Sequence, residues 1–190
     1  MASKVEICNK GLQLLGAKRI TDLAENSRNA KACNFVYESL KRECLRLHVW
    51  MFSIKRADLA ADSPAPSWGR ANSFTLPSDF IRLAKPYPED DYNSRDWLIE
   101  GKKILTDESA PLYIRYVYDV TDPNEMDSLF IKYFSAEIAN TLCEEITQSN
   151  TKQAKAIAER DDALAKAKKI NAIEQPPQQA VEDPWVTVRS

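Results

Sequence analysis

Paired carboxylates are the side chains in this sequence that come closest to a catalytic arrangement. They occur in three places, Glu89-Asp90-Asp91, Glu144-Glu145 and Asp161-Asp162. General acid–base catalysis needs two carboxyl groups in one cleft with different environments, because one of them holds a proton while the other is ionised. Adjacent residues on a helix point in different directions. We therefore interpret all three places as solvated surface charge and assign no catalytic residue.

The sequence contains few residues suited to binding a metal ion or a phosphate group. The four cysteines are widely spaced and fall on or near apolar helical stripes: Cys8, Cys33, Cys44 and Cys143. A zinc site needs thiolate or imidazole ligands at short spacings, and His48 is the only histidine in the chain. The chain has only four glycines, which makes a phosphate-cradling loop a poor interpretation. We therefore expect no metal and no cofactor, and cysteines that act as small apolar residues in a reduced core.

The basic run Lys166-Ala167-Lys168-Lys169 is the main candidate for contact with DNA or an acidic partner. Near the C-terminal end of a helix, such a run also offsets the helix dipole while it stays in water, and we prefer this interpretation. A formal net charge of −2 and a pI near 5.6 argue against a general nucleic-acid-binding protein, since that binding depends on a basic surface. Trp50 and Trp68 are interpreted as packing residues rather than as platforms for a stacked ligand.

The composition is that of an ordinary globular protein. The 190 residues are 44% hydrophobic, which is enough for one domain that buries a core without metals or disulfides. The N-terminus lacks the apolar core of a signal peptide, and no run approaches about 18 consecutive apolar residues. We therefore expect a protein made in the cytoplasm, with no membrane-spanning segment.

The first 50 residues predict two helices that pack as an antiparallel hairpin. The first carries an apolar stripe that ends at Gly16, which suits a left-handed C-cap. Ser27 is a good N-cap for the second helix. The apolar positions of that helix recur at steps of three and four: Ala30, Cys33, Tyr37, Leu40, Cys44 and Leu47. Each stripe must be buried against a neighbour.

After Trp50 the pattern changes to the alternation of β-strands. One strand follows Trp50 directly, and further candidates are 73–76, 81–84, 97–100, 103–106 and 112–118. Gly101-Lys102 suits the turn of a hairpin. In 112–118 the side chains divide between two faces. Leu112, Ile114, Tyr116 and Tyr118 lie on one, and Tyr113, Arg115 and Val117 on the other.

The C-terminal third predicts two helices and a tail. Asp122 is placed as the N-cap of a helix that runs to about Thr147, and an Ala- and Lys-rich helix follows over 151–173. From 174 to 190 the composition shifts to Gln, Pro and acidic residues, which cannot form a core. The tail nevertheless ends in an apolar tip that we expect to dock on a partner: Pro184, Trp185, Val186, Val188 and Arg189. A terminus with incidental apolar residues is the alternative.

Residues 9–59 resemble the opening of tail tubular protein A, the head-to-tail adaptor of short-tailed phages. They begin NKGLQLLGAKRITDLAENSRNAKACNF and end HVWMFSIKRADL. The shared features are an Asn before a Leu-rich run that ends Leu-Gly, an Ala-rich helix start, and the pair Trp50 and Phe52 before a strand. The segment Leu76-Pro77-Ser78-Asp79-Phe80 is also of a type found in this family. The resemblance covers roughly residues 5–170 and is strongest in the first third.

The elements predict an α+β fold, mainly an α-helical bundle with an inserted β-rich lobe and an extended C-terminal tail. Residues 1–50 would be the N-terminal helical hairpin of the bundle and 51–120 the inserted lobe. Residues 121–173 would be the helices that complete the bundle, and 174–190 the docking tail.

The resemblance implies a structural virion protein without enzymatic activity. Its copies would form a ring, by expectation a dodecamer, that joins the portal protein to a tail nozzle protein of the tubular B type. A heterologous interface repeated by rotation closes into such a ring. Genomic DNA would pass through the lumen without sequence-specific binding, and no membrane partner is implied. The protein would reside at the portal vertex of the virion, and the family's use of extended C-termini at subunit or portal contacts favours a docked tail.

Two other classes of function stay open. A small α-helical interaction or regulatory protein would be a stable monomer or dimer that is indifferent to a portal. A cell-wall hydrolase associated with the tail would have a cleft in the β-rich lobe and would lose turnover when one specific carboxylate is replaced. Within the adaptor interpretation, a related head-completion protein would share most of these features.

Overall fold

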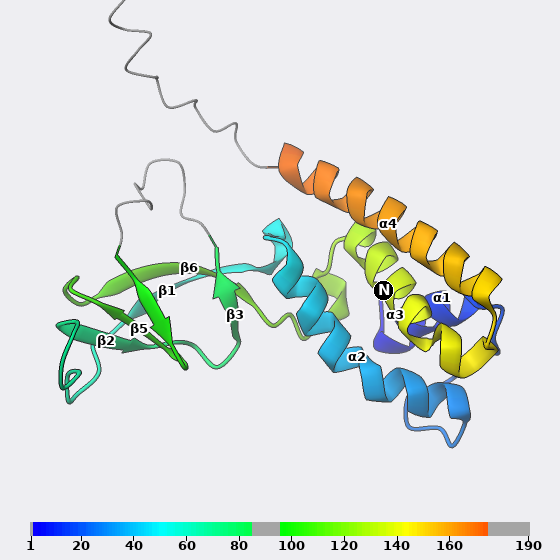
Figure 1. The fold of residues 1–190 in the computed structure, drawn as a ribbon, viewed down its shortest axis with the longest axis horizontal. Coiled ribbons are helices and arrows are strands. Elements are labelled where there is room, and N and C mark those ends of the chain that lie inside the picture. Colours follow the sequence, from blue (N-terminus) through cyan, green and yellow to red (C-terminus); the bar gives the residue numbers. More distant parts are fainter. Residues whose placement is uncertain (1, 85–95, 175–190) are drawn as a thin grey trace, which may run out of the picture.

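The computed structural model describes residues 2–84 and 96–174, which form a mixed α+β fold (Figure 1). The helices are α1 (Lys4–Leu14), α2 (Arg28–Leu47), α3 (Ser128–Thr147) and α4 (Asn150–Ile173). The strands are β1 (Ile54–Leu59), β2 (Asn72–Thr75), β3 (Phe80–Leu83), β4 (Leu98–Glu100), β5 (Lys103–Thr106) and β6 (Leu112–Tyr118). Short 3-10 helices, η1 (Met51–Ser53) and η3 (Pro123–Glu125), lie where the chain passes between helices and strands.

The turn between α1 and α2 has the capping residues that the sequence predicts. Gly16 adopts a left-handed backbone with φ of +64°, and Ser27 caps α2 by accepting a hydrogen bond from the Ala30 N–H. Asn9 holds the returning chain, because its side chain donates to the Ile20 carbonyl and accepts from the Ile20 N–H, each at 2.8 Å. The Asn that opens the family resemblance therefore has a structural role in this turn.

Helix α1 packs mainly against α3, although the sequence predicts a hairpin with α2. The first two helices do touch, as the ion pair between Lys4 and Glu38 shows. An apolar stripe indicates that a helix face is covered, but it does not say which neighbour covers it.

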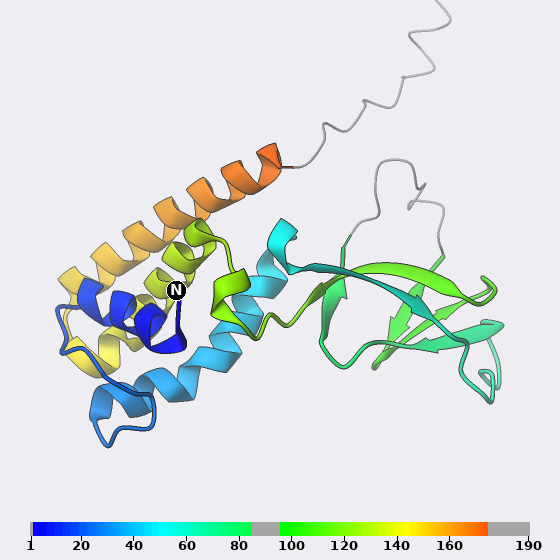
Figure 2. The same cartoon turned by 180° about the vertical axis from the view of Figure 1, so that it is seen from behind.

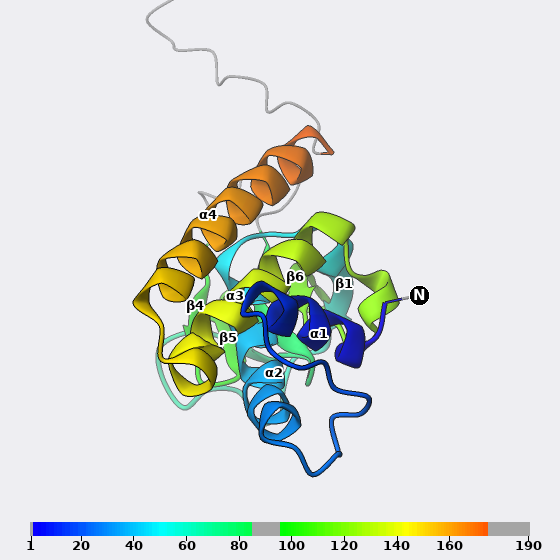
Figure 3. The ribbon, with the colours of Figure 1, turned by 90° about the vertical axis from the view of Figure 1, so that its right-hand side faces the viewer.

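Helix α3 is the central helix of the described structure. It contacts α1, α2 and α4, and in Figure 3 it lies between α2 and α4. Its approach to α1 is close because Gly11 has no side chain. A Cβ atom at Gly11 would lie 2.8 Å from the Ser135 carbonyl oxygen and 3.2 Å from a methyl carbon of Ile138.

The start of α3 differs from the sequence-based prediction. Asp122 does accept a hydrogen bond from the Asn124 N–H, but it caps only η3. Asp127 is the N-cap of α3, and its carboxylate accepts hydrogen bonds from the N–H groups of Leu129 and Phe130. The prediction of a helix that begins at Asp122 was therefore wrong at its start, because a second Asp further along caps the long helix.

The strands pair in two antiparallel sheets, in the orders β1-β6-β3 and β2-β5-β4. Strands β5 and β6 have the predicted bounds, whereas β2, β3 and β4 differ from the prediction by one residue. The hairpin of β4 and β5 is confirmed. Gly101 adopts the positive φ, +58°, that a two-residue turn requires.

Strand β6 connects two hydrophobic cores through its two faces. Leu112, Ile114 and Tyr116 are buried among the strands, whereas Val117 is buried against the helices. This alternation confirms the predicted division of the strand. Figure 2 shows the helices on one side and the strands on the other. No helix in residues 2–84 and 96–174 combines the length and apolar character needed to cross a membrane.

The structure confirms the predictions made for Trp50 and the cysteines but not the one made for Trp68. Trp50 is a packing residue, as predicted, since its indole N–H donates to the Cys44 carbonyl and its ring packs edge to face on Phe130. Trp68 is 88% exposed, so its interpretation as a packing residue was wrong. All four cysteines are buried and free, which confirms their place in the apolar interior.

Candidate partner interfaces

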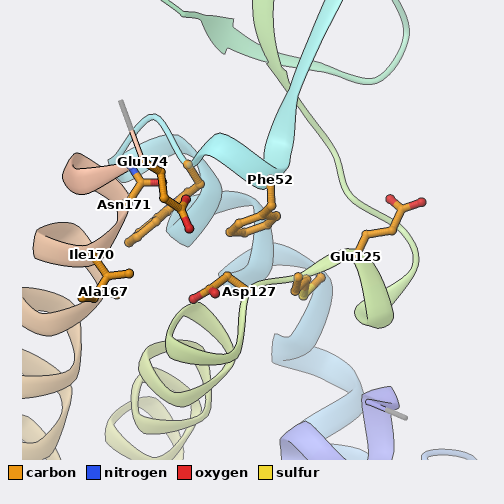
Figure 4. Close-up of a pocket in the computed structure, with 9 residues that line it drawn as sticks. Phe52, Glu125, Asp127, Ala167, Ile170, Asn171 and Glu174 are labelled. Carbon is orange, nitrogen blue, oxygen red and sulfur yellow. The ribbon is translucent and has the colours of Figure 1, made fainter. Parts of the chain in front are cut away.

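A cleft of about 190 Å³ lies where α4 ends and the strands begin (Figure 4). Its walls come from η1, η3, the start of α3 and the last turns of α4. The apolar lining consists of Trp50, Phe52, Met126, Ala167 and Ile170. Carboxylates of Glu125, Asp127 and Glu174 also line it. In Figure 4 the Asp127 and Glu174 side chains point toward the space beside Phe52, whereas Glu125 points away.

Asn171 fixes the wall of this cleft. Its side chain is almost fully buried and spans from α4 to the chain that follows α2. The amide oxygen accepts from the Met51 N–H at 2.8 Å, and the amide nitrogen donates to the Val49 carbonyl at 2.9 Å. The same nitrogen lies 3.0 Å from Nε2 of His48. Because the buried amide forms its hydrogen bonds, its burial carries little free-energy penalty, and the bonds hold α4 in place against the chain that follows α2.

His48 is held in the form that can accept this hydrogen bond. Burial lowers the pKa of His48 below its ordinary value of 6.5, and the positive charges of Lys168 and Arg82 lower it further. The imidazole is therefore neutral at pH 7, so Nε2 can accept the hydrogen bond from the Asn171 amide.

Two of the carboxylates in the cleft already have structural partners. Asp127 caps α3, and Glu125 accepts a hydrogen bond from the Tyr118 hydroxyl at 2.7 Å. Burial is the largest cause that raises the pKa of Tyr118 to about 12, and the hydrogen bond to Glu125 is the next largest. The hydroxyl therefore keeps its proton at neutral pH. The cleft is thus an aromatic surface edged by fixed negative charge. Such a surface suits the apolar stem and the positive charge of a Lys or Arg side chain.

A second, larger groove of about 570 Å³ lies on the sheet β2-β5-β4. Its apolar lining consists of Pro64, Pro66, Trp68, Leu98 and Leu105. Arg70 lines it as well, but its guanidinium is paired with the carboxylates of Asp96 and Asp107. The exposed indole of Trp68 makes this groove a second candidate surface for a partner.

The carboxylate pairs do not converge on either concavity. Glu144 and Glu145 are exposed on α3, and Asp161 and Asp162 are exposed on α4. Their exposure confirms the interpretation of these two pairs as surface charge. The acidic run 89–91 lies outside the described residues. Within the described residues, no group of three or more His, Cys, Asp and Glu side chains is placed to hold a metal ion.

The basic run near the end of α4 is divided between two faces of the helix. Ala167 is buried, whereas Lys166 is exposed and pairs with Asp162 one turn earlier at 2.6 Å. The predicted latch residues lie outside the described residues: Pro184, Trp185, Val186, Val188 and Arg189. Their docking stays a prediction.

No protein-family model matches this sequence, and no curated protein has a significant sequence match to it.

Three residues were not predicted correctly from the sequence: Asn171 and Phe35 were not singled out, and Trp68 was assigned to packing. Asn171 is a polar residue on the buried side of α4, a signal that could have marked it as a buried hydrogen-bonding group. Phe35 is 88% exposed on α2, and it falls off the apolar stripe of that helix, so its exposure was open to prediction. Trp68 follows a Pro-rich loop, and nothing in that pattern distinguishes an exposed indole from a buried one.

Proposed function

We propose that this protein is a structural, non-enzymatic virion protein: a head-to-tail adaptor of the short-tailed phage type. In this proposal an α-helical bundle carries an inserted β-rich lobe and an extended C-terminal tail. Copies form a ring between the portal protein and the tail nozzle protein. The resemblance of residues 9–59 to the adaptor family is the starting point, and the placement of exposed apolar side chains supports it.

The observation that carries the proposal is that large apolar side chains are exposed in well-separated parts of the molecule. Phe35 lies on α2, Trp68, Ile99 and Tyr113 lie among the strands, and Ile173 lies at the end of α4. Isolated exposed apolar residues are common, but a bare Phe on a helix and a bare Trp between two strands favour several partner contacts. An adaptor needs such contacts with its own copies and with two different neighbours.

The three contacts are assigned by the division of the chain. The helices provide the lateral and portal contacts, the strands face the nozzle, and the tail around Trp185 latches onto a neighbouring copy or the portal. A net charge of −2 suits a lumen through which DNA passes without being held, because a strongly basic wall would retain it.

Co-sedimentation with purified portal rings from the same source tests the proposal. An adaptor moves with the rings and releases when salt or competitor removes its contacts. A regulatory helical protein stays in the supernatant. A peptidoglycan-release assay run on the same preparation separates the hydrolase alternative, which predicts turnover with or without portal.

A further inference from the structure

The outward face of α2 combines an exposed aromatic ring with positive charge. Lys31, Phe35 and Arg42 are separated by four and seven residues, so they lie on one side of the helix. All three are exposed, and the Phe35 ring is 88% accessible. The Arg42 guanidinium pairs with Asp119 at 3.5 Å, whereas the Lys31 side chain forms no ion pair within residues 2–84 and 96–174. Aromatic and basic side chains together are typical of the central contacts of protein interfaces.

The outward face of α4 offers a patch of matching character. Ile157 is partly exposed on this helix, and Ala154 and Ala158 beside it are exposed too. Ala154 lies one turn before Ile157 and adds only a methyl group beside it, which leaves room for an aromatic ring to lie against the isoleucine. Asp161 follows one turn after Ile157, and its carboxylate is 60% exposed and pairs only with the adjacent Arg160 in the described structure.

The spacing and the charges of the two faces correspond. Lys31 lies four residues before Phe35, and Asp161 lies four residues after Ile157. When the two helices cross in antiparallel directions, Phe35 against Ile157 brings Lys31 beside Asp161. An aromatic ring against an aliphatic side chain, with opposite charges one turn away, gives a defined register, which a random pair of exposed helices lacks.

One molecule cannot make this contact with itself. Helix α3 lies between α2 and α4, and the two faces point outward from different flanks of the helical part (Figures 1 and 3). We propose that the α2 face of one copy docks on the α4 face of a second copy, with Phe35 on Ile157 and Lys31 beside Asp161. This contact rests on the proposed function in that it supplies the lateral interface of the ring.

The symmetry of this contact follows from the use of two different faces. Each copy presents one α2 face and one α4 face, so the interface is heterologous, and its repetition by rotation closes a ring or extends a chain. An interface built from α2 against α2 would instead stop at a dimer. The two cases differ in which cysteine pairs cross-link.

Site-directed cross-linking distinguishes them. The natural cysteines are buried, so a short bis-maleimide reports mainly on introduced ones. In a concentrated solution, a mixture of Ser39→Cys and Ala154→Cys copies is expected to give covalent dimers, while either variant alone gives none. Both positions are exposed, and both leave Phe35 and Ile157 in place. A double variant with both substitutions should give a ladder of higher oligomers. A matched control pairs Ala154→Cys with Gln13→Cys, an exposed position on α1 that makes no predicted contact.

A second experiment exchanges the charges of Lys31 and Asp161. Lys31→Glu should lower the yield of the mixed cross-link several-fold, and Asp161→Lys in the α4-contributing copy should restore it. The proposal is overturned if the mixed pair cross-links no more than the control pair, or if Ser39→Cys alone forms dimers. If portal rings still bind the protein when the cross-link fails, the adaptor function stands and the lateral contact lies elsewhere.

Discussion

At the residue scale, Gly11 sets the distance between α1 and α3. Gly11→Ala places a Cβ atom at 2.8 Å from a backbone carbonyl that cannot move freely. Overpacking of this kind costs about 1 to 3 kcal/mol, and the gain in helix propensity returns about 1 kcal/mol. We expect a net loss of about 1 kcal/mol in the free energy of unfolding, measured by urea denaturation. Gln13→Ala, on the exposed face of the same helix, should be neutral or slightly stabilising, and equal losses in both variants would contradict the account.

Asp79, in the Leu-Pro-Ser-Asp-Phe segment, has a structural role. Its carboxylate accepts hydrogen bonds from the Lys55 ammonium at 2.9 Å and from the Tyr116 hydroxyl at 3.0 Å. It therefore links β1 and β6 to the turn that precedes β3. Burial alone would raise the pKa of Asp79, but these two hydrogen bonds outweigh it and hold the pKa below the ordinary value of 3.8.

The sign of the pH dependence follows from that lowered pKa. The stabilisation by Asp79 is fully present above about pH 4, where the unfolded chain is also ionised, and it is lost as the pH falls through the lowered folded pKa. Asp79→Asn should cost about 1 kcal/mol at neutral pH, and the difference from wild type should shrink as the pH drops below about 4. Urea unfolding at several pH values checks this. Asp58→Asn, an exposed acid on β1, should show no such convergence, and a pH-independent cost for Asp79→Asn would contradict the role given to its charge.

At the element scale, the sequence predicted the strands better than the packing of the helices. Strand β6 was found with its two faces because its alternation is uninterrupted, and Gly101 marked the hairpin of β4 and β5. The partner of α1 was missed, since the close approach at Gly11 depends on α3, which lies far along the chain. The cleft at the end of α4 was also missed, because it forms only when Asn171 bonds to the chain after α2.

The two N-cap aspartates before α3 offer a direct test at this scale. Asp127→Ala should cost about 1 kcal/mol in the free energy of unfolding, because it leaves two N–H groups of a long core helix without their partner. Asp122→Ala should cost less, since Asp122 caps only the short η3. Thermal denaturation of the two variants side by side gives the comparison. A larger loss for Asp122→Ala would reverse the assignment of the caps.

At the scale of the whole molecule, the tail and the body are expected to have separable roles. Deletion of residues 180–190 should leave the melting temperature and circular dichroism spectrum unchanged, because the Gln-, Pro- and acid-rich composition of 174–190 cannot form a core. The same deletion should weaken attachment to portal rings. A full-strength attachment after deletion would remove the latch from the account, and replacement of Trp185 alone by Ala tells whether the apolar tip is responsible.

The central claim is that many copies of this protein assemble on one portal ring. The most direct measurement is the mass of the purified protein, alone and mixed with portal rings from the same source, by light scattering on a sizing column. The account predicts a gain in mass of about a dozen subunits per portal ring. A protein that stays monomeric or dimeric in both runs, and leaves the mass of the portal unchanged, would contradict it.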